Sequence, residues 1–354
     1  DWLLDGSSAS HDIEVGFRYH QDEEDRLQRS DKYTQVDQTL IVDSIGVTGG
    51  NKNNRVVQAE ALAIYIKDDI TFGNFIVTPG VRFEDIKLER RDWSTLPRNT
   101  TPSLKQNSVT AVLPSIGVLY NVNDNLSLLA GAYNGFGTPT TTSGVDEEQA
   151  LNVELGGRYQ QADLMIELIA FTSDYENLVG ECTASSSTSD CDIGDQFNGG
   201  QATVRGLEFQ LTNSFQLTDS TTMPVSIAYT YTDAEFDSTF DGEFFGDVSK
   251  GDPIPYIPEN QVALALGLEN GPYSINANLN YVDAVCVKAS CVDFEKTDDS
   301  TVLDLVGNYQ VNDNLGVYLR LENITDEADI IARQPKGARP NKARSATIGM
   351  RLVF

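Results

Sequence analysis

The last stretch of the chain, Arg344-Ser-Ala-Thr-Ile-Gly-Met-Arg-Leu-Val-Phe354, decides the fold. Every second side chain from Ala346 to Phe354 is apolar, and the positions between them are mostly polar or small. A period of two over about ten residues gives a strand one apolar and one polar face, as a transmembrane β-strand needs when lipid touches one side and a lumen the other. The segment is therefore predicted to be the closing strand of a β-barrel.

The same alternation recurs along the chain and predicts about fourteen strands. Turn-forming and polar residues separate them, and no proline-rich or glycine/serine-rich linker divides the chain. We therefore expect residues 1–354 to form one all-β unit. The expected strands are 12–20, 58–67, 75–84, 109–122, 126–134, 150–159, 164–175, 204–212, 225–232, 262–268, 273–282, 302–311, 315–324 and 344–354.

The connections between these strands alternate between short turns and long polar loops. Asn123-Asp124-Asn125 is one of the short turns, and 90–106 is one of the long loops. Outer-membrane barrels have short periplasmic turns and long external loops, whereas a soluble β-sandwich has no reason to sort its connections in this way. The predicted fold is a transmembrane antiparallel β-barrel, and tyrosines near strand ends, such as Tyr120 and Tyr273, suit aromatic girdles.

Composition argues against several classes of function. The net charge of -28 disfavours a nucleic-acid partner, whose phosphates need lysine and arginine to neutralise them. A solvated acidic surface is the simpler explanation for this charge.

No apolar run reaches the roughly eighteen residues of a membrane helix, but a β-barrel hides its apolarity in alternation. The first residues lack a basic start and a long apolar run, so we expect a mature, processed or partial chain without a secretory signal.

The four cysteines suit two loop disulfides formed in an oxidising compartment. A zinc site is disfavoured because neither cysteine pair has a C-x2-C spacing and both histidines, His11 and His20, lie far away in sequence. We therefore expect no metal centre and no cofactor. The pairs, each inside a polar segment, are Cys182 with Cys191 and Cys286 with Cys291.

Catalysis is not predicted, because no G-x-S-x-G, H-E-x-x-H or glycine-rich phosphate loop is present. We interpret His20 as a lumen-facing residue at a strand end. The acidic loop 233–252 offers hard oxygen ligands that suit calcium, but Thr239 and Val248 stand where an EF-hand needs ligands. A solvated acidic loop is favoured over a calcium site.

Arginine is concentrated in two other loops. Arg90 and Arg91 lie in the expected loop 90–106, and Arg333 and Arg339 lie in the last loop, 325–343. Guanidinium groups bind carboxylates through two parallel hydrogen bonds, so these four side chains are the candidate contacts for an anionic ligand. Contact with lipopolysaccharide phosphates, or solubility alone, explains the same residues equally well. The mixed charges on the lumen-facing side of the strands are expected to pair with one another or with a plug domain.

Short sequence motifs that follow one another along most of the chain give a further signal. They are N-G-F-G-T-P (134–139), A-L-N-V-E-L-G-G-R-Y (150–159), A-F-T-S-D-Y-E-N-L (170–178), V-R-G-L-E (204–208), P-Y-I-P-E-N-Q (255–261), L-E-N-I-T-D (321–326) and the terminal Phe354. Each motif is weak alone, but in this order the set is specific and resembles one family, the TonB-dependent outer-membrane receptors. Within that family, the segment 14–25, with G-F-R-Y-H-Q-D-E-E-D at its heart, is most similar to the ferric-citrate receptor branch.

The resemblance implies a 22-stranded barrel filled by an N-terminal plug, so residues 1–354 are expected to be its C-terminal portion, with the plug and early strands absent. It implies a Gram-negative outer-membrane receptor, not an enzyme, that imports ferric citrate or another siderophore. The implied partners are the ferric chelate, the plug and TonB system, outer-membrane lipid and lipopolysaccharide, and the barrel assembly machinery, which reads the terminal Phe354 as a signal. Thr138 and Ser143 depart from the family pattern and leave the ligand contacts open.

Two alternatives to the receptor remain. A self-contained porin-like barrel of about fourteen strands would pass solutes passively. A soluble, acidic, β-rich adhesion or scaffold protein would stay in solution without detergent.

Overall fold

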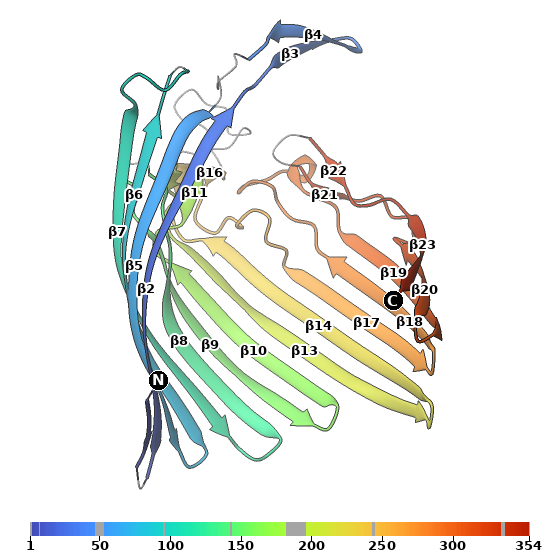
Figure 1. Ribbon diagram of the computed structural model, residues 1–354. Coiled ribbons are helices and arrows are strands. Elements are labelled where there is room, and N and C mark those ends of the chain that lie inside the picture. The colour runs from blue at the N-terminus through green and yellow to red at the C-terminus, as the bar shows by residue number, and fades with distance from the viewer. Residues whose placement is uncertain are drawn as a thin grey trace.

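In the computed structural model the chain forms one 15-stranded antiparallel sheet that curves around a central space (Figure 1). The structure describes residues 2–6, 8–46, 53–94, 96–141, 144–181, 196–242, 245–333 and 337–353. Neighbouring strands of the sheet follow chain order throughout, as in an up-and-down meander. The predicted all-β fold with a large antiparallel sheet is confirmed.

Fourteen of the fifteen strands correspond to predicted ones, and β1, with only four residues, is the one that the alternation missed. The sheet consists of β1 (Trp2–Asp5), β2 (Ser10–Gln28), β5 (Asn53–Phe72), β6 (Phe75–Asp92), β7 (Ser103–Asn121), β8 (Leu126–Gly137), β9 (Glu148–Gln161), β10 (Leu164–Tyr175), β13 (Ala202–Thr218), β14 (Thr221–Phe236), β17 (Asn260–Asn270), β18 (Tyr273–Val282), β19 (Ser300–Asn312), β20 (Leu315–Glu322) and β23 (Ser345–Leu352).

The connections alternate between short and long as predicted. Gly73-Asn74 joins β5 to β6 and Gly271-Pro272 joins β17 to β18, and both glycines have positive φ values, 54° and 52°. Glycine reaches this region without a Cβ clash, which permits such tight turns. The opposite end of the sheet carries the long loops. These contain the 3-10 helix η1 (Asp293–Glu295) and four small hairpins: β3 (Lys32–Val36) with β4 (Thr39–Ser44), β11 (Val179–Glu181) with β12 (Gln196–Asn198), β15 (Phe240–Gly242) with β16 (Gly246–Val248), and β21 (Ile330–Ala332) with β22 (Arg339–Pro340).

The two faces of the sheet differ in polarity. Large apolar side chains are exposed on the outer face, including Phe17 at 69% and Ile348 at 83% exposure. The inner face carries charged residues such as Glu14 and Lys67, whose carboxylate and ammonium groups lie 3.1 Å apart. Because Ile348 belongs to the predicted closing strand, its exposure confirms that the apolar side of that strand faces outward.

Several strands extend beyond their predicted ends at the long-loop end. The predicted end of the first long strand at His20 is wrong, because β2 continues to Gln28 and pairs with β5 along its whole length. The predicted start of a loop at Arg90 is also wrong, since β6 runs to Asp92. His20 therefore lies within β2, on the inner face, and its Nε2 is 2.8 Å from the Asp22 carboxylate.

Aromatic rings gather at the short-turn end. The rings of Phe72 and Phe75 stack with centroids 5.5 Å apart, and Phe75 stacks on Tyr120 at 4.5 Å. Tyr273 and Tyr309 form a second stack, with centroids 4.7 Å apart. These positions agree with the predicted aromatic girdle on this side.

The long loops share a small hydrophobic core. Phe236 is fully buried, and Phe245, Val248, Ala202 and Ala289 pack with it. These residues come from β13, the end of β14, the β14–β17 connection and the β18–β19 connection, so the core joins segments that are far apart in sequence. Packing of apolar side chains therefore holds these loops to one another.

The predicted disulfide between Cys286 and Cys291 is present, with an S–S distance of 2.08 Å. Cys182, Cys191 and Phe354 lie outside the described residues, and their predicted roles stay predictions. The described residues include no helix with the length and apolarity of a membrane span.

Candidate ligand-binding site

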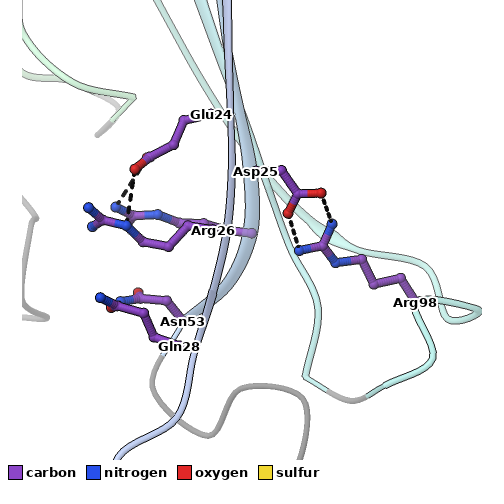
Figure 2. Close-up of polar contacts among 7 residues, drawn as sticks. Glu24, Asp25, Arg26, Gln28, Asn53 and Arg98 are labelled. Atoms are coloured by element: carbon purple, nitrogen blue, oxygen red, sulfur yellow. Dashed lines mark hydrogen bonds and ion pairs between the residues drawn. The ribbon is translucent and has the colours of Figure 1, made fainter.

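Charged side chains at the long-loop ends of β2, β5 and β6 form the candidate site. In Figure 2, Glu24 and Arg26 point to one side of β2. Asp25 points to the other side, toward Arg98. Successive strand residues face opposite sides, so the first pair belongs to the inner face and the second to the outer face.

Neighbouring strands place two more arginines on the inner face. Arg26 lies directly opposite Arg55 on β5, and Arg55 lies opposite Asp92 on β6. Arg90 is two residues before Asp92 and therefore shares its face. Three guanidinium groups and the carboxylates of Glu24 and Asp92 thus gather in what we call the inner arginine cluster.

Ion pairs satisfy two of the three arginines in this cluster. Nε of Arg26 lies 3.0 Å from the Glu24 carboxylate, and Nε of Arg90 lies 2.8 Å from the Asp92 carboxylate. Arg55 is only 12% exposed, its Nη2 is 3.9 Å from Glu24, and its Nε is buried without a hydrogen-bond partner among the described residues.

The structure separates Arg90 from Arg91, which the sequence grouped together. Arg91 faces outward, where its Nη2 donates a hydrogen bond to the Gln58 side chain and its Nε lies 3.1 Å from Glu89. Arg98, in the following loop, donates two hydrogen bonds to Asp25, of 2.6 and 3.0 Å. Its guanidinium lies 4.9 Å from the Trp93 ring centroid.

Arg333 and Arg339 belong to the last loop, beside the opposite edge of the sheet. Nε of Arg333 donates a hydrogen bond to the Lys296 carbonyl, and its guanidinium lies 5.1 Å from the Phe294 ring centroid. Arg339 is an exposed residue of β22 opposite Ala332. Figure 1 shows β21 and β22 across the opening from β5 and β6. The four predicted arginines therefore do not form one cluster.

Other inner-face charges pair with one another, as predicted for lumen-facing residues. The Arg82 guanidinium donates to the Glu84 carboxylate of the same strand at 2.6 Å, and Arg158 pairs with Glu167 on the next strand. On the outer face, in the acidic segment, Asp233 accepts two hydrogen bonds from Arg205. No group of three potential metal ligands occurs within the described part of the chain.

Arg26 and Arg55 are absent from the predicted site because the expected strands 12–20 and 58–67 leave both residues in the polar connection between them, whereas β2 and β5 extend into it. Residues 21–26 are all polar or charged, so the two-residue alternation of apolar side chains stops before Arg26. Only the strand register shows that Arg26, Arg55 and Asp92 are neighbours. This register was not recoverable from composition or periodicity.

The chain is similar to receptors of known structure. It aligns with the siderophore receptor PiuA from Acinetobacter baumannii with a TM-score of 0.75 and 18% identity, covering 99% of this chain and 54% of that one. It aligns with the ferric citrate transporter FecA in its unliganded form with a TM-score of 0.74 and 20% identity, covering 98% of this chain and 52% of that one. At these identities the likeness establishes the fold, and the chain spans about half the length of both structures.

Sequence comparison adds a curated relative and a family. The metal-pseudopaline receptor CntO of Pseudomonas aeruginosa strain UCBPP-PA14 is 25% identical over 290 residues, which are 78% of this chain and 38% of that protein. The family model described as TonB dependent receptor-like, beta-barrel, matches residues 1–324. That match covers most of the chain, and the chain therefore belongs to the family of TonB-dependent receptor β-barrels.

Proposed function

We propose that the full-length protein is a Gram-negative outer-membrane receptor that imports a ferric chelate, ferric citrate or another siderophore, by TonB-dependent transport. The observation that carries the proposal is the inner arginine cluster at the long-loop end of a sheet of this family, in a chain whose net charge is -28. Cations concentrated at one inner site of an otherwise acidic protein favour an anionic ligand there. The names of the similar receptors support a metal-containing cargo.

The proposed transport involves no bond chemistry by this chain. The long loops and the inner face bind the chelate, and a plug domain outside residues 1–354 couples its release to the TonB system. The exposed apolar outer face suits contact with membrane lipid, and the polar ends of the long strands suit contact with lipopolysaccharide. Recognition of Phe354 by the barrel assembly machinery belongs to the same proposal.

Uptake of radioactive iron tests this function. A strain lacking the gene, complemented with the full-length protein, should accumulate iron from ferric citrate or a siderophore, and loss of TonB should abolish that accumulation. Replacing Arg90, Arg91, Arg333 and Arg339 together by Ala should weaken chelate binding, because each loses a guanidinium donor. Absence of TonB-dependent uptake for every ferric chelate tried would refute the function, and unchanged affinity of the four-Ala variant would remove these arginines from it.

A further inference from the structure

The hairpin of β3 and β4, in the connection between β2 and β5, is open to solvent along both of its strands. Figure 1 shows it standing clear of the other labelled strands at the long-loop end. Exposed apolar patches on a folded protein mark contact surfaces, and a two-stranded hairpin alone is only marginally stable in water. The hairpin therefore needs a surface that covers it. Its large apolar side chains, which are between 48% and 66% exposed, are Tyr33, Val36, Leu40, Ile41 and Val42.

One face of the hairpin is more apolar than the other. Residues that lie opposite each other in an antiparallel pair share a face. On the opposite face, each apolar side chain has a threonine as its register partner, as in the pair Ile41–Thr34. Contact through the more apolar face removes more apolar surface from water. That face, which we call the apolar hairpin face, consists of Tyr33, Gln35, Leu40 and Val42.

Neither membrane lipid nor the loop core covers the apolar hairpin face. The outer face of β2 becomes polar at Gln21, and the strand continues to Gln28, about 30 Å beyond Tyr19 at a rise of about 3.3 Å per residue. The hairpin therefore lies outside the apolar band that lipid contacts. The loops around Phe236 pack with one another, and the hairpin does not belong to their core.

The edge of β2 that leads to the hairpin lacks a ladder partner in the described part of the chain. β1 pairs only with Ser10–Ile13, at the short-turn end, whereas β5 pairs with the other side of β2 along its full length. The edge from Glu14 to Gln28 is therefore open, and its N–H and C=O groups can pair with another strand. Because β1 is antiparallel to β2, a continuation of β1 before Trp2 runs along this edge toward the hairpin.

We propose that in the full-length protein the segment preceding residue 1 prolongs β1 along the open edge of β2, and that the long loop before this segment packs on the apolar hairpin face. The receptors of similar structure are about twice as long as this chain, which provides the length that such a loop needs. Burial of Tyr33, Leu40 and Val42 stabilises the contact, and the preformed β3–β4 ladder keeps its entropic cost low. The hairpin is then a fixed part of the external wall. This role goes beyond the proposed transport function and is independent of the cargo.

Single cysteines in the full-length protein, labelled on intact cells with a membrane-impermeant maleimide, test which face is covered. Val42→Cys should react at least about tenfold more slowly than Ile41→Cys, because the contact buries only the first side chain. The two positions are a matched pair, since they are adjacent in β4 and both are 49% exposed in residues 1–354. The unsubstituted protein gives the background from its own four cysteines. Equal labelling of the two variants, fast or slow, contradicts a contact through the apolar hairpin face.

Photo-crosslinking identifies the segment that covers the face. Leu40→benzoylphenylalanine in the same full-length protein, irradiated on cells and mapped by peptide mass spectrometry, should join this position to a peptide that precedes residue 1. The same substitution at Thr39, on the opposite face, is the control and should give less of this product. The absence of a crosslink, or one to a second copy, to another protein or to residues 1–354, refutes the proposal, as does protection of Val42→Cys only after ferric citrate is added. Neither measurement requires transport, so this proposal and the iron-uptake function fail separately.

Discussion

On the outer face, the ionisable pair His11–Asp68 lies among apolar neighbours. Nδ1 of His11 lies 2.8 Å from the Asp68 carboxylate, and the other oxygen of Asp68 is buried without a hydrogen-bond partner among the described residues. Asp68 lies opposite Ile13, and its neighbours on the same face of β5 are Ile66 and Ile70. On the face expected to contact lipid, such a pair is costly unless its partners remain together.

Breaking this pair should destabilise the protein more than removing it. His11→Leu leaves the Asp68 carboxyl unpaired and should lower the free energy of unfolding in phospholipid vesicles by about 2 kcal/mol. Replacing both residues by Leu should restore or exceed the original stability, because it removes both desolvation costs. Denaturant unfolding followed by fluorescence measures these differences.

The inner face supplies a matched control for that experiment. His20 and Asp22 form a second pair of the same length, 2.8 Å, on the polar side of the same strand. His20→Leu should change the free energy of unfolding little, because Asp22 remains in a polar environment. Equal effects of the His11 and His20 substitutions would contradict a lipid-facing position for the first pair.

The sequence alone does not predict which face of the sheet some charged side chains occupy. Arg90 and Arg91 are adjacent, and the sequence predicts that both lie in one loop, yet β6 continues through both and places them on opposite faces. The face of a side chain follows from strand parity only if the strand is known to continue. For Arg55, even parity is insufficient, because Arg26 reaches it from β2, and the long loop between β2 and β5 does not fix the register of these two strands.

At the scale of strands, the apolar alternation predicts every strand of the main sheet except β1. It does not predict how far these strands extend. Lipid requires apolar side chains only within a band about 25 Å tall, so the sequence signal ends at the edge of that band while backbone pairing continues. The change from apolar to polar side chains on the outer face can be seen by comparing two rows of register partners on β2, β5, β6 and β7. The apolar row is Phe17, Ile64, Phe83 and Val112. The polar row lies four residues nearer the long loops and is Gln21, Glu60, Lys87 and Ser108.

The loop core was equally hidden, because its apolar residues lie within segments that read as polar. Phe236 is fully buried, and its ring meets Phe240 and Phe245 edge to face, with centroids 5.6 and 5.1 Å away. The carboxylates of segment 233–252 favour a solvated acidic loop and give no sign of these aromatic contacts. Such a core depends on long-range packing, which a local pattern does not encode.

Truncating the loop core should loosen the long loops without unfolding the sheet. Phe236→Ala should cost about 3 to 5 kcal/mol of local packing and increase hydrogen exchange in 237–242 and 283–299. Exchange within β17 and β18 should stay slow, because their ladders do not depend on this ring. Phe294→Ala, at an 80% exposed position in a neighbouring loop, is the control. Faster exchange throughout the sheet would show that the loops and strands unfold as one unit.

At the scale of the molecule, the sheet has two edges. In the part of the chain that the structure describes, β1 pairs only with β2 and β23 only with β20, so the ends of the sheet do not meet. Inside a membrane each unpaired backbone group costs several kcal/mol, and closed barrels avoid that cost. The similar receptor structures are about twice as long as this chain. We therefore propose that further strands of the full-length protein close the barrel between β1 and β23.

This proposal distinguishes the receptor from a self-contained passive-diffusion barrel. A protein limited to residues 1–354, folded into detergent micelles, should migrate identically on a gel with and without heating, because open edges prevent a stable closed barrel. The full-length protein should migrate differently before and after heating, as a heat-stable barrel does. Planar bilayer conductance gives the second measurement, since only a closed barrel of 354 residues would conduct steadily by itself. A heat-modifiable, conducting 354-residue protein would mean that β1 and β23 meet directly, and it would favour passive diffusion over coupled transport.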